Sequence, residues 1–309
     1  MRVVVVGLGT QGHKRQRVAG GDCVATVDPV NPDADHKNIE DVPPSDFDAA
    51  LVCTPDAAKP EILRKLIADG KHILVEKPLI SGDSATLAEL QALAVDAGVV
   101  LYTAYNHRFE PHFVTMKRLI ESGELGRIYS VRMFYGNGTA RLVRDSAWRD
   151  EGTGVLDDLG SHLLDTIRFW FGDDGITAPL SVRSARRFEN RSFDHVVLDS
   201  AGDIQLQLEM TLLMWRNHFT CDILAEQGSA HIESLCKWGP SRFVHRRRVL
   251  PSGRPQEDEE TLIKADPTWE LEYAHFVGLC ETGGPGNTET DIWIEDQLLT
   301  LGAQALEEA

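Results

Sequence analysis

Basic charge, long apolar runs and a leader segment are all scarce or missing in this 309-residue chain. The 31 Lys and Arg residues face 48 Asp and Glu, so the chain lacks the net basic surface that a nucleic acid backbone or an anionic membrane requires. No apolar run approaches the roughly 20 residues of a membrane-spanning helix. The start, Met1-Arg2, leads directly into an apolar segment without a charged leader and cleavage site. We therefore expect a cytoplasmic protein with no nucleic acid or membrane partner.

Cysteine is sparse and scattered. The five cysteines are an odd number, they lie far apart, and they form no C-x-x-C pair of the kind found in zinc or redox sites. We interpret them as small buried hydrophobic residues in a reducing compartment, the alternative being a reactive thiol. Internal repeats and low-complexity segments are also lacking. With 42% hydrophobic and 26% charged residues, the chain has the composition of a globular protein with room for two domains.

A short apolar segment that runs directly into glycines is the most informative feature present. Residues 3–12 read VVVVGLGTQG, and four valines bounded by glycine suit a strand buried on both faces of a parallel sheet. The glycines form G-x-G-x-x-G, which allows a tight turn, close approach to a pyrophosphate and close packing of the next helix. That helix directs its free N–H groups at the phosphates. We expect cofactor contacts from Gly7, Gly9, Thr10, Gln11 and Gly12.

Asp28 ends the second predicted strand, 16 residues after Gly12. A carboxylate at this place accepts hydrogen bonds from the adenosine ribose and repels a 2′-phosphate, so we expect NAD rather than NADP. The alternative is an acidic turn residue. The polar, proline-punctuated stretch between Asp28 and Asp48 is too short for a full helix and strand. It predicts a loop with at most one helical turn and a minimal strand near residues 38–42.

Short apolar segments then alternate with helical ones, as in a doubly wound parallel sheet. The pattern predicts strands over 23–28, 49–53, 72–75 and 99–102, and helices over 13–18, 58–69 and 84–97. Residues 1–105 would form a dinucleotide-binding domain. Thr54 and Pro55 follow one strand and Glu76 and Lys77 follow the next, so we expect all four at the carboxyl edge of the sheet, where the cofactor binds.

After residue 105 the pattern changes to that of an α+β domain over 106–309. Strand-like segments follow one another without intervening helices, which indicates a large, mostly antiparallel open sheet. The predicted strands are 128–135, 181–188, 195–199, 204–210, 217–225, 229–234, 242–249 and 259–264. The predicted helices are 111–122, 155–171, 267–280 and 290–306. Residues 251–260 read as a solvated loop. A broad sheet face needs covering, so we expect a homodimer or homotetramer formed through this domain.

Two stretches outside the glycine loop carry candidate chemistry. The ammonium of Lys77 suits donation to a substrate oxygen, although a lysine after a strand is often only a surface residue. Asp158 and His162 stand four apart on a predicted helix, where a carboxylate orients an imidazole for general-base work. The alternatives are a surface contact, a metal site that includes Asp157 and Asp165, or a solvent-facing or structural role for Asp165. No outlying His or Cys cluster completes a ligand set, so we expect no metal.

Four further residues are candidates for lining the substrate, beside Lys77 itself. An aromatic side chain suits the face of a sugar, and an arginine suits a carboxylate or a phosphate. The alternative for the arginines is a role in holding the two domains together. The four candidates are Arg108, Tyr135, Trp148 and Arg149. We expect His107, His112 and His218 to be structural or exposed.

Together these features resemble the glucose–fructose oxidoreductase and inositol dehydrogenase family, Gfo/Idh/MocA. The segments that carry the resemblance are GLGTQG at 7–12, CTPDAAKPEI at 53–62, EKPL at 76–79, YNHRFEPHFVTMKRLIESGELGRIYSV at 105–131 and GTGVLDDLGSHLLD at 152–165. The resemblance implies a Rossmann domain, then a substrate-binding domain with a large open sheet, and NAD(P)-dependent chemistry at a carbinol carbon of a sugar, cyclitol or sugar nucleotide. It also implies that Lys77, Asp158 and His162 form the catalytic trio, with a cis bond before Pro78.

The chain departs from the family pattern in three places. The second Rossmann helix is contracted, the usual triple glycine is Gly152-Thr153-Gly154, and the histidine common after the T-P turn is missing, which leaves Asp56-Ala57-Ala58-Lys59. An NAD-dependent oxidoreductase is the function that we expect, since the trio is retained. The rival functions are a dinucleotide-binding regulator without turnover and an aldose–aldose oxidoreductase with permanently bound cofactor.

Overall fold

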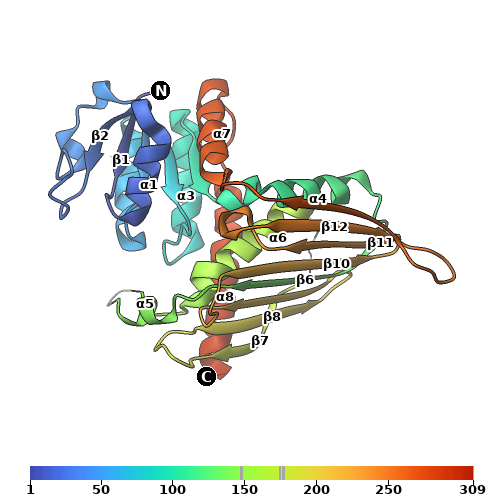
Figure 1. The fold of residues 1–309 in the computed structure, drawn as a ribbon. Helices are drawn as coiled ribbons and strands as arrows, with labels where there is room; N and C mark the ends of the chain where they lie inside the picture. The colour runs from blue at the N-terminus through green and yellow to red at the C-terminus, as the bar shows by residue number, and fades with distance from the viewer. Residues whose placement is uncertain (147–148, 174, 176–177, 309) are drawn as a thin grey trace. The chain divides into compact units, whose positions relative to one another are not determined.

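The computed structural model describes residues 1–146, 149–173, 175 and 178–308, which divide by backbone contacts into two units. Unit 1 comprises Met1–Asn106 and Thr268–Asp296, and unit 2 comprises His107–Pro267 and the residues from Gln297 onward. Each unit contains one sheet (Figure 1). Within the described residues, no helix has both the length and the apolar character needed to cross a membrane.

Unit 1 contains a five-stranded sheet in the order β2-β1-β3-β4-β5, with every neighbouring pair parallel. The strands are β1 (Val3–Val6), β2 (Cys23–Val27), β3 (Ala49–Val52), β4 (His72–Glu76) and β5 (Leu101–Ala104). The helices are α1 (Thr10–Ala19), α2 (Lys59–Ala68), α3 (Ser84–Ala97) and α7 (Thr268–Thr282), and α8 (Thr288–Glu308) begins in this unit. The predicted doubly wound sheet is confirmed.

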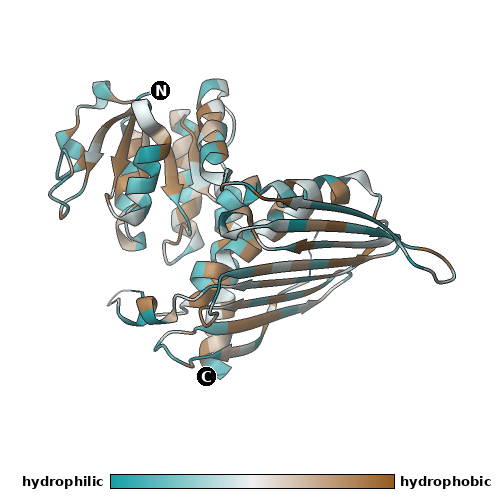
Figure 2. Cartoon of the chain, in the orientation of Figure 1, coloured by the Kyte–Doolittle hydropathy of each residue, from teal (hydrophilic) through white to brown (hydrophobic). Residues whose placement is uncertain are grey.

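Both faces of this sheet are buried, which explains the unbroken apolar runs in its sequence. Val4 and Val6 face a core that includes residues of α2 and α3. Val3 and Val5 point the other way, into a core shared with α1 and α7. Figure 2 shows the difference from unit 2, where apolar and polar residues alternate along the strands.

The stretch after β2 is contracted as predicted. The minimal strand expected near residues 38–42 is not formed, and the prediction of at most one helical turn is also wrong. Two single-turn 3₁₀ helices, Ile39–Asp41 and Pro44–Asp46, occupy the stretch instead. The first turn is closed locally, because the carboxylate of Asp41 accepts a hydrogen bond from the Asn38 N–H at 3.0 Å. This local bond competes with strand pairing, and only an isolated bridge between Val27 and His36 extends the sheet here.

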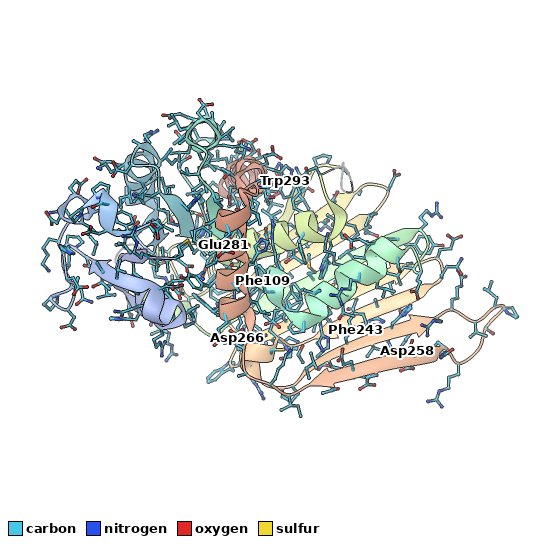
Figure 3. The ribbon with its side chains drawn as sticks, turned by 90° about the horizontal axis from the view of Figure 1, so that it is seen from above. Phe109, Phe243, Asp258, Asp266, Glu281 and Trp293 are labelled. Carbon is cyan, nitrogen blue, oxygen red and sulfur yellow. The ribbon has the colours of Figure 1, made fainter. Side chains whose placement is uncertain are left out.

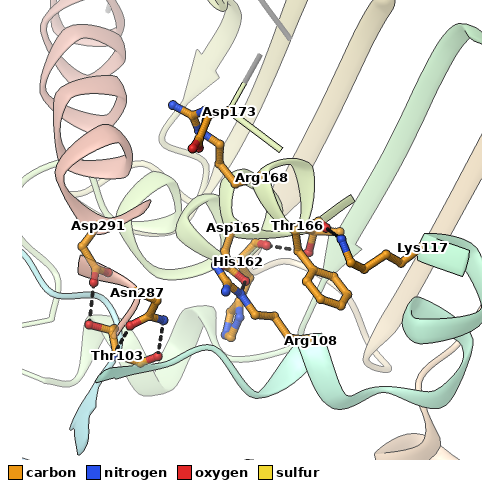
Figure 4. A network of polar contacts seen from close by, with 11 residues as sticks. Thr103, Arg108, Lys117, His162, Asp165, Thr166, Arg168, Asp173, Asn287 and Asp291 are labelled. Carbon is orange, nitrogen blue, oxygen red and sulfur yellow. Dashed lines mark hydrogen bonds and ion pairs between the residues drawn. The ribbon is translucent and has the colours of Figure 1, made fainter. Parts of the chain in front are cut away.

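The segment 268–296 joins unit 1 through β5. The side chain of Asn287 accepts from the Thr103 N–H at 2.7 Å and donates to the Thr103 carbonyl at 2.8 Å, as a neighbouring strand would. The Thr103 hydroxyl donates to Asp291 at 2.7 Å (Figure 4). These buried contacts anchor the start of α8 to the parallel sheet.

Unit 2 contains an eight-stranded sheet in the order β13-β12-β11-β10-β6-β9-β8-β7. Only β6 and β9 pair in parallel; the other neighbours are antiparallel, as predicted. The strands are β6 (Ile128–Gly136), β7 (Ser181–Arg186), β8 (His195–Ala201), β9 (Gln205–Thr211), β10 (His218–Ala225), β11 (Gly228–Glu233), β12 (Ser241–Arg247) and β13 (Gln256–Leu262). The helices of this unit are α4 (Pro111–Ser122), α5 (Ala140–Arg144), which was not predicted, and α6 (Ser161–Phe171).

The solvated loop predicted over 251–260 is wrong in its second half, because β13 begins at Gln256. Three arginines on β12 hold this acidic strand: Arg242 contacts Glu259 at 2.7 Å, and Arg246 and Arg247 form further ion pairs with β13. Figure 3 shows Asp258 on this edge strand, whereas Phe243 on β12 stacks with His112 of α4. Charge complementarity between the two strands replaces the apolar alternation that marks the others.

Candidate active site

The glycine loop of unit 1 has the backbone geometry of a cradle. Gly7 has a φ of 91°, and a Cβ there would lie 2.8 Å from the carbonyl of Cys53. A Cβ on Gly12 would lie 1.9 Å from the carbonyl oxygen of Gly7, so α1 packs against the loop only because residue 12 is glycine. A Cβ on Gly9, in contrast, would meet nothing within 4 Å. The loop is therefore tight on its protein side and open at Gly9.

Two polar features at this loop suit an anionic ligand with hydroxyl groups. Helix α1 begins at Thr10 after a Gly9 N-cap that makes no side-chain hydrogen bond, so its first N–H groups remain available to an anion. The Thr54 hydroxyl, after β3, is buried without a hydrogen-bond partner among the described residues. Together with the open side at Gly9, these residues fit the pyrophosphate of a dinucleotide.

Asp28 ties the end of β2 to the glycine loop. Its carboxylate accepts a hydrogen bond from the Leu8 N–H at 2.7 Å and from the N–H groups of Val30 and Asn31 at 2.8 Å each. The Asn31 amide in turn donates to the Leu8 carbonyl at 2.8 Å. Partial burial opposes ionisation of Asp28, but the three backbone donors outweigh it and lower the pKa of the carboxyl group. Asp28 therefore presents a fixed negative charge beside the loop.

Glu76 ends β4 with its carboxylate in a buried ion-pair network. Glu76 accepts from Arg15 Nε of α1 at 2.6 Å, and Arg15 Nη2 lies 2.7 Å from Glu272 of α7. Burial disfavours the charge on Arg15, but the two glutamates raise its pKa overall. The Lys77–Pro78 peptide bond, which follows directly after β4, is cis, as the resemblance implies. Arg15 was not predicted as part of the site, since no motif distinguishes it from other helix residues.

In unit 2, His162 lies in a cluster of rings. It is 6% exposed on α6, and its imidazole stacks on that of His107 with centroids 4.0 Å apart. The Tyr135 ring lies 5.9 Å from His162. Lys237 places its ammonium 3.2 Å from His107 Nε2 and 3.5 Å from the Tyr135 hydroxyl, over the ring of Trp238. We call these five residues the His162 cluster.

Three of its members, His107, Lys237 and Trp238, were not predicted as functional. His107 is buried, so its expected structural or exposed role did not anticipate the stacking on His162. Lys237 lies on a 3₁₀ turn between β11 and β12, about 75 residues after His162, and no local motif marks it. Burial, with Asp158 and Glu110 nearby, raises the pKa of Tyr135, which therefore keeps its hydroxyl proton.

Asp158 lies in an irregular part of the predicted helix. Residues Leu156–Gly160 form a π turn, and the regular helix α6 starts only at Ser161, so the expected α-helical spacing from Asp158 to His162 is interrupted. Such turns are frequent at functional sites. The Asp158 carboxylate lies 3.8 Å from Arg149. Trp148, expected to line the substrate, lies outside the described residues.

Arg108 makes a forked ion pair with Asp165 (Figure 4). Asp165 is buried, so of the roles left open for it the structural one fits and the solvent-facing one is wrong. Among the described residues, no group of three His, Cys, Asp or Glu side chains has the arrangement needed to hold a metal.

Two family models match the chain in sequence. The oxidoreductase family with an NAD-binding Rossmann fold matches residues 1–105, and the GFO/IDH/MocA C-terminal domain matches 113–231. A scyllo-inositol 2-dehydrogenase (NADP(+)), IolW, of Bacillus subtilis is 30% identical over 82% of this chain and 67% of its own length. The chain belongs to the Gfo/Idh/MocA oxidoreductase family.

Other family members align over shorter stretches. Glucose-6-phosphate 3-dehydrogenase of Bacillus subtilis is 28% identical over 52% of this chain, and the alignment spans about half, 47%, of that relative. The Gfo/Idh/MocA fold extends over the whole chain. A solved levoglucosan dehydrogenase in complex with NADH has a TM-score of 0.84 at 18% identity, over 100% of this chain and 98% of its own. Because it belongs to this family, the chain is an oxidoreductase with an NAD(P)-binding Rossmann fold.

Proposed function

We propose that this family member transfers a hydride between NAD and a secondary hydroxyl or keto carbon of a sugar, cyclitol or sugar-nucleotide-like substrate. The observation that carries the proposal is the His162 cluster, in which a buried imidazole is surrounded by aromatic rings and polar donors. Aromatic faces and convergent donors suit a polyhydroxylated ring. The dehydrogenases among the relatives are named for substrates of this class, an inositol and a sugar phosphate.

We propose NAD rather than NADP on the basis of Asp28. Its ionised carboxylate beside the glycine loop suits a ribose hydroxyl and opposes a second phosphate. The relative IolW is NADP-dependent by name, whereas levoglucosan dehydrogenase was solved with NADH, so the relatives support either cofactor. The remaining cofactor contacts that we propose come from the glycine loop, Thr54, Pro55, Glu76 and Lys77.

The roles proposed for the catalytic residues follow from their chemistry. Bound NAD supplies the acceptor for the hydride. His162 takes the hydroxyl proton on an imidazole nitrogen, and Asp158 orients that imidazole. The Lys77 ammonium donates to the substrate oxygen and stabilises the negative charge that develops there. Tyr135, neutral for the reasons given above, offers its hydroxyl to a second substrate oxygen, and Arg108, Trp148 and Arg149 remain proposed contacts.

Turnover of NAD with a panel of polyols and sugars, followed by absorbance of the reduced cofactor, tests this proposal. On the best substrate, Lys77→Ala and His162→Ala should each lower kcat by about 10²- to 10⁴-fold. His218→Ala is the matched control, since His218 lies on β10 outside the His162 cluster, and it should leave kcat within about twofold. If both test variants turned over at the rate of the parent, the catalytic roles of Lys77 and His162 would be refuted. NAD binding without turnover of any substrate would favour the rival function, a dinucleotide-binding regulator.

We also propose a homodimer or homotetramer formed through the eight-stranded sheet. One face of that sheet packs against α4 and α6, as Figure 1 shows. The other face is left with exposed residues such as Leu224 of β10. Light scattering at micromolar concentration tests this, and a monomer would refute it. A cytoplasmic location stays a prediction from the sequence.

A further inference from the structure

Lys59 is a fully buried lysine whose ammonium is completely enclosed by acceptors within unit 1. Its side chain is about 1% exposed at the start of α2, where an unpaired lysine would be costly. Nζ lies 2.6 Å from the carboxylate of Asp56, 2.6 Å from the carbonyl oxygen of Glu76 and 2.7 Å from that of Pro78. Three acceptors match the three N–H bonds of an ammonium group.

The two carbonyls are those of the residues on either side of Lys77. Lys59 therefore fixes the backbone before and after the proposed catalytic lysine. The side chain of Glu76 is fixed as well, by its 2.6 Å contact with Arg15. A side chain that donates to a reacting oxygen must be placed to within a fraction of an ångström. The position of its backbone fixes the point from which the side chain extends.

We infer that Lys59 is a positioning residue for Lys77: its ammonium clamps the Glu76 and Pro78 carbonyls and so holds the Lys77 side chain in its working place. The inference rests on the proposed function, in which Lys77 contacts the substrate. An ammonium group is suited to this task, since its three N–H bonds serve both carbonyls and Asp56 at once. The histidine that is common after the T-P turn in this family, and missing here, would offer at most two N–H groups.

Lys71 provides a matched control in the same unit. Its Nζ also donates to two backbone carbonyls, those of Pro44 at 2.6 Å and Phe47 at 2.9 Å, and neither belongs to the 76–78 segment. Lys59→Met and Lys71→Met thus remove the same kind of clamp. We expect Lys59→Met to lower kcat by about 10- to 100-fold with the KM for NAD within about threefold, and Lys71→Met to leave kcat within about twofold.

Conservative variants separate positioning from folding. Lys59→Arg retains a cation with several N–H donors and should restore kcat to within about tenfold of the parent. Lys59→Gln keeps a polar group in the buried site and should show the same loss of kcat even if Lys59→Met does not fold. Full kcat in both Lys59→Met and Lys59→Gln would overturn the inference.

A double variant tests whether Lys59 acts through Lys77. In the Lys77→Ala background, Lys59→Met should lower kcat by less than about twofold, because the group that it positions is already gone. Multiplied losses would assign Lys59 a general structural role and overturn the inference. A parent-like Lys77→Ala would instead refute the proposed function, so the two failures are distinguishable.

Hydrogen exchange provides a readout that does not depend on activity. Lys59→Met should speed amide exchange in residues 75–79 by about tenfold or more relative to the parent, whereas Lys71→Met should not. Unchanged exchange in this segment in Lys59→Met would overturn the inference even if the activity of Lys77→Ala is too low to measure.

Discussion

Arg108 binds the buried carboxylate of Asp165 on both oxygens, with Nε 3.0 Å from each and Nη2 2.5 Å from Oδ1. Asp165 is 1% exposed and Arg108 18% exposed at the side chain. Burial raises the pKa of Asp165, and the guanidinium of Arg108 opposes that rise. Asp165 lies on α6, one turn from His162, so the integrity of the pair bears on the backbone that presents the proposed base.

Removing the arginine of this pair should destabilise the protein far more than breaking the pair of Arg168 with Asp173, whose carboxylate is exposed just beyond the end of α6. Arg108→Ala leaves a buried, uncompensated carboxylate, and we expect a loss of about 3–5 kcal/mol in the free energy of unfolding. Asp173→Ala, which removes the exposed partner of Arg168, should cost less than about 1 kcal/mol. Urea denaturation measures both.

The double variant Arg108→Met/Asp165→Leu should recover most of the lost stability, because it removes both charges together. If Arg108→Ala instead matches Asp173→Ala, the pair contributes nothing to folding, and a substrate role for Arg108 gains weight.

The parallel sheet was predictable because it is buried on both faces. Four valines in a row satisfy two cores at once, so the run of residues 3–6 signals this strand without reference to the rest of the chain. Gly7 and Gly12 after it are required by close contacts, of Gly7 with Cys53 and of Gly12 with Gly7, and the motif spacing encodes both. Local sequence was sufficient here because local geometry imposes the constraint.

The acidic strand β13 was not predictable, since its reason for existing lies on another strand. Residues 256–260 read QEDEE, a typical solvated segment, and they pair with β12 through Arg242, Arg246 and Arg247. The unit to which residues 268–296 belong is likewise decided by distant contacts, for example that between Thr103 and Asn287, which are 184 residues apart. The pattern within one segment predicts neither the pairing of β13 with β12 nor the unit to which residues 268–296 belong.

Some residues of the candidate site could be predicted from local motifs, and others could not. Lys77, Asp158 and His162 stand in short motifs, so the sequence indicates them. His107 and Lys237 meet 130 residues apart in sequence, and only the folded sheet brings the ammonium to the imidazole. The π turn beside Asp158 is also not indicated by the sequence, since Leu156 and Leu159 are buried three residues apart, as they would be in a regular α-helix.

Alanine at Gly9 should weaken NAD binding without unfolding the protein. Gly9 has a φ of −84°, and a methyl group added there would have no neighbour within 4 Å, so the protein itself tolerates the substitution. The added methyl occupies the space that we assign to the pyrophosphate, and we expect the Kd for NAD to rise about tenfold or more. Calorimetric titration and thermal unfolding measure the two effects.

Gly21→Ala is the matched control for Gly9→Ala. Gly21 also lacks neighbours within 4 Å, and it lies beyond the end of α1, so both NAD affinity and stability should stay near the parent values. Gly12→Ala should lower both the affinity for NAD and the stability, because the added Cβ collides with the Gly7 carbonyl. Unchanged NAD affinity in Gly9→Ala would contradict the placement of the cofactor.

Neutralising Asp28 should change the choice of cofactor. Asp28→Asn removes the negative charge that opposes a 2′-phosphate, and we expect the ratio of kcat/KM for NAD to that for NADP to fall about tenfold or more. Asn31→Ala loosens the same loop by deleting the 2.8 Å bond to the Leu8 carbonyl, with no change of charge. Asn31→Ala should lower kcat/KM for NAD and for NADP by the same factor. An unchanged ratio in Asp28→Asn would show that Asp28 acts only as a turn residue.

Glu110, buried before α4, should make stability depend on pH in an unusual direction. Burial raises its pKa from the ordinary value of 4.5, although the Cys236 N–H at 3.2 Å and the charge of Lys237 act against that rise. Between 4.5 and the raised value, the folded state binds more protons at Glu110 than the unfolded state does. The contribution of Glu110 to the free energy of unfolding therefore falls as pH rises through that window.

Glu110→Gln does not titrate, so its stability relative to the parent should improve as pH rises from about 4.5 and then level off above the folded pKa. Urea denaturation of both proteins at a series of pH values measures this difference, and groups that titrate equally in both cancel. The Glu110 Oε1 atom is buried without a partner among the described residues, so the amide is not expected to break a bond there. A difference that declines with rising pH would mean that Lys237 and the Cys236 N–H outweigh burial, and that Glu110 is held ionised beside the His162 cluster.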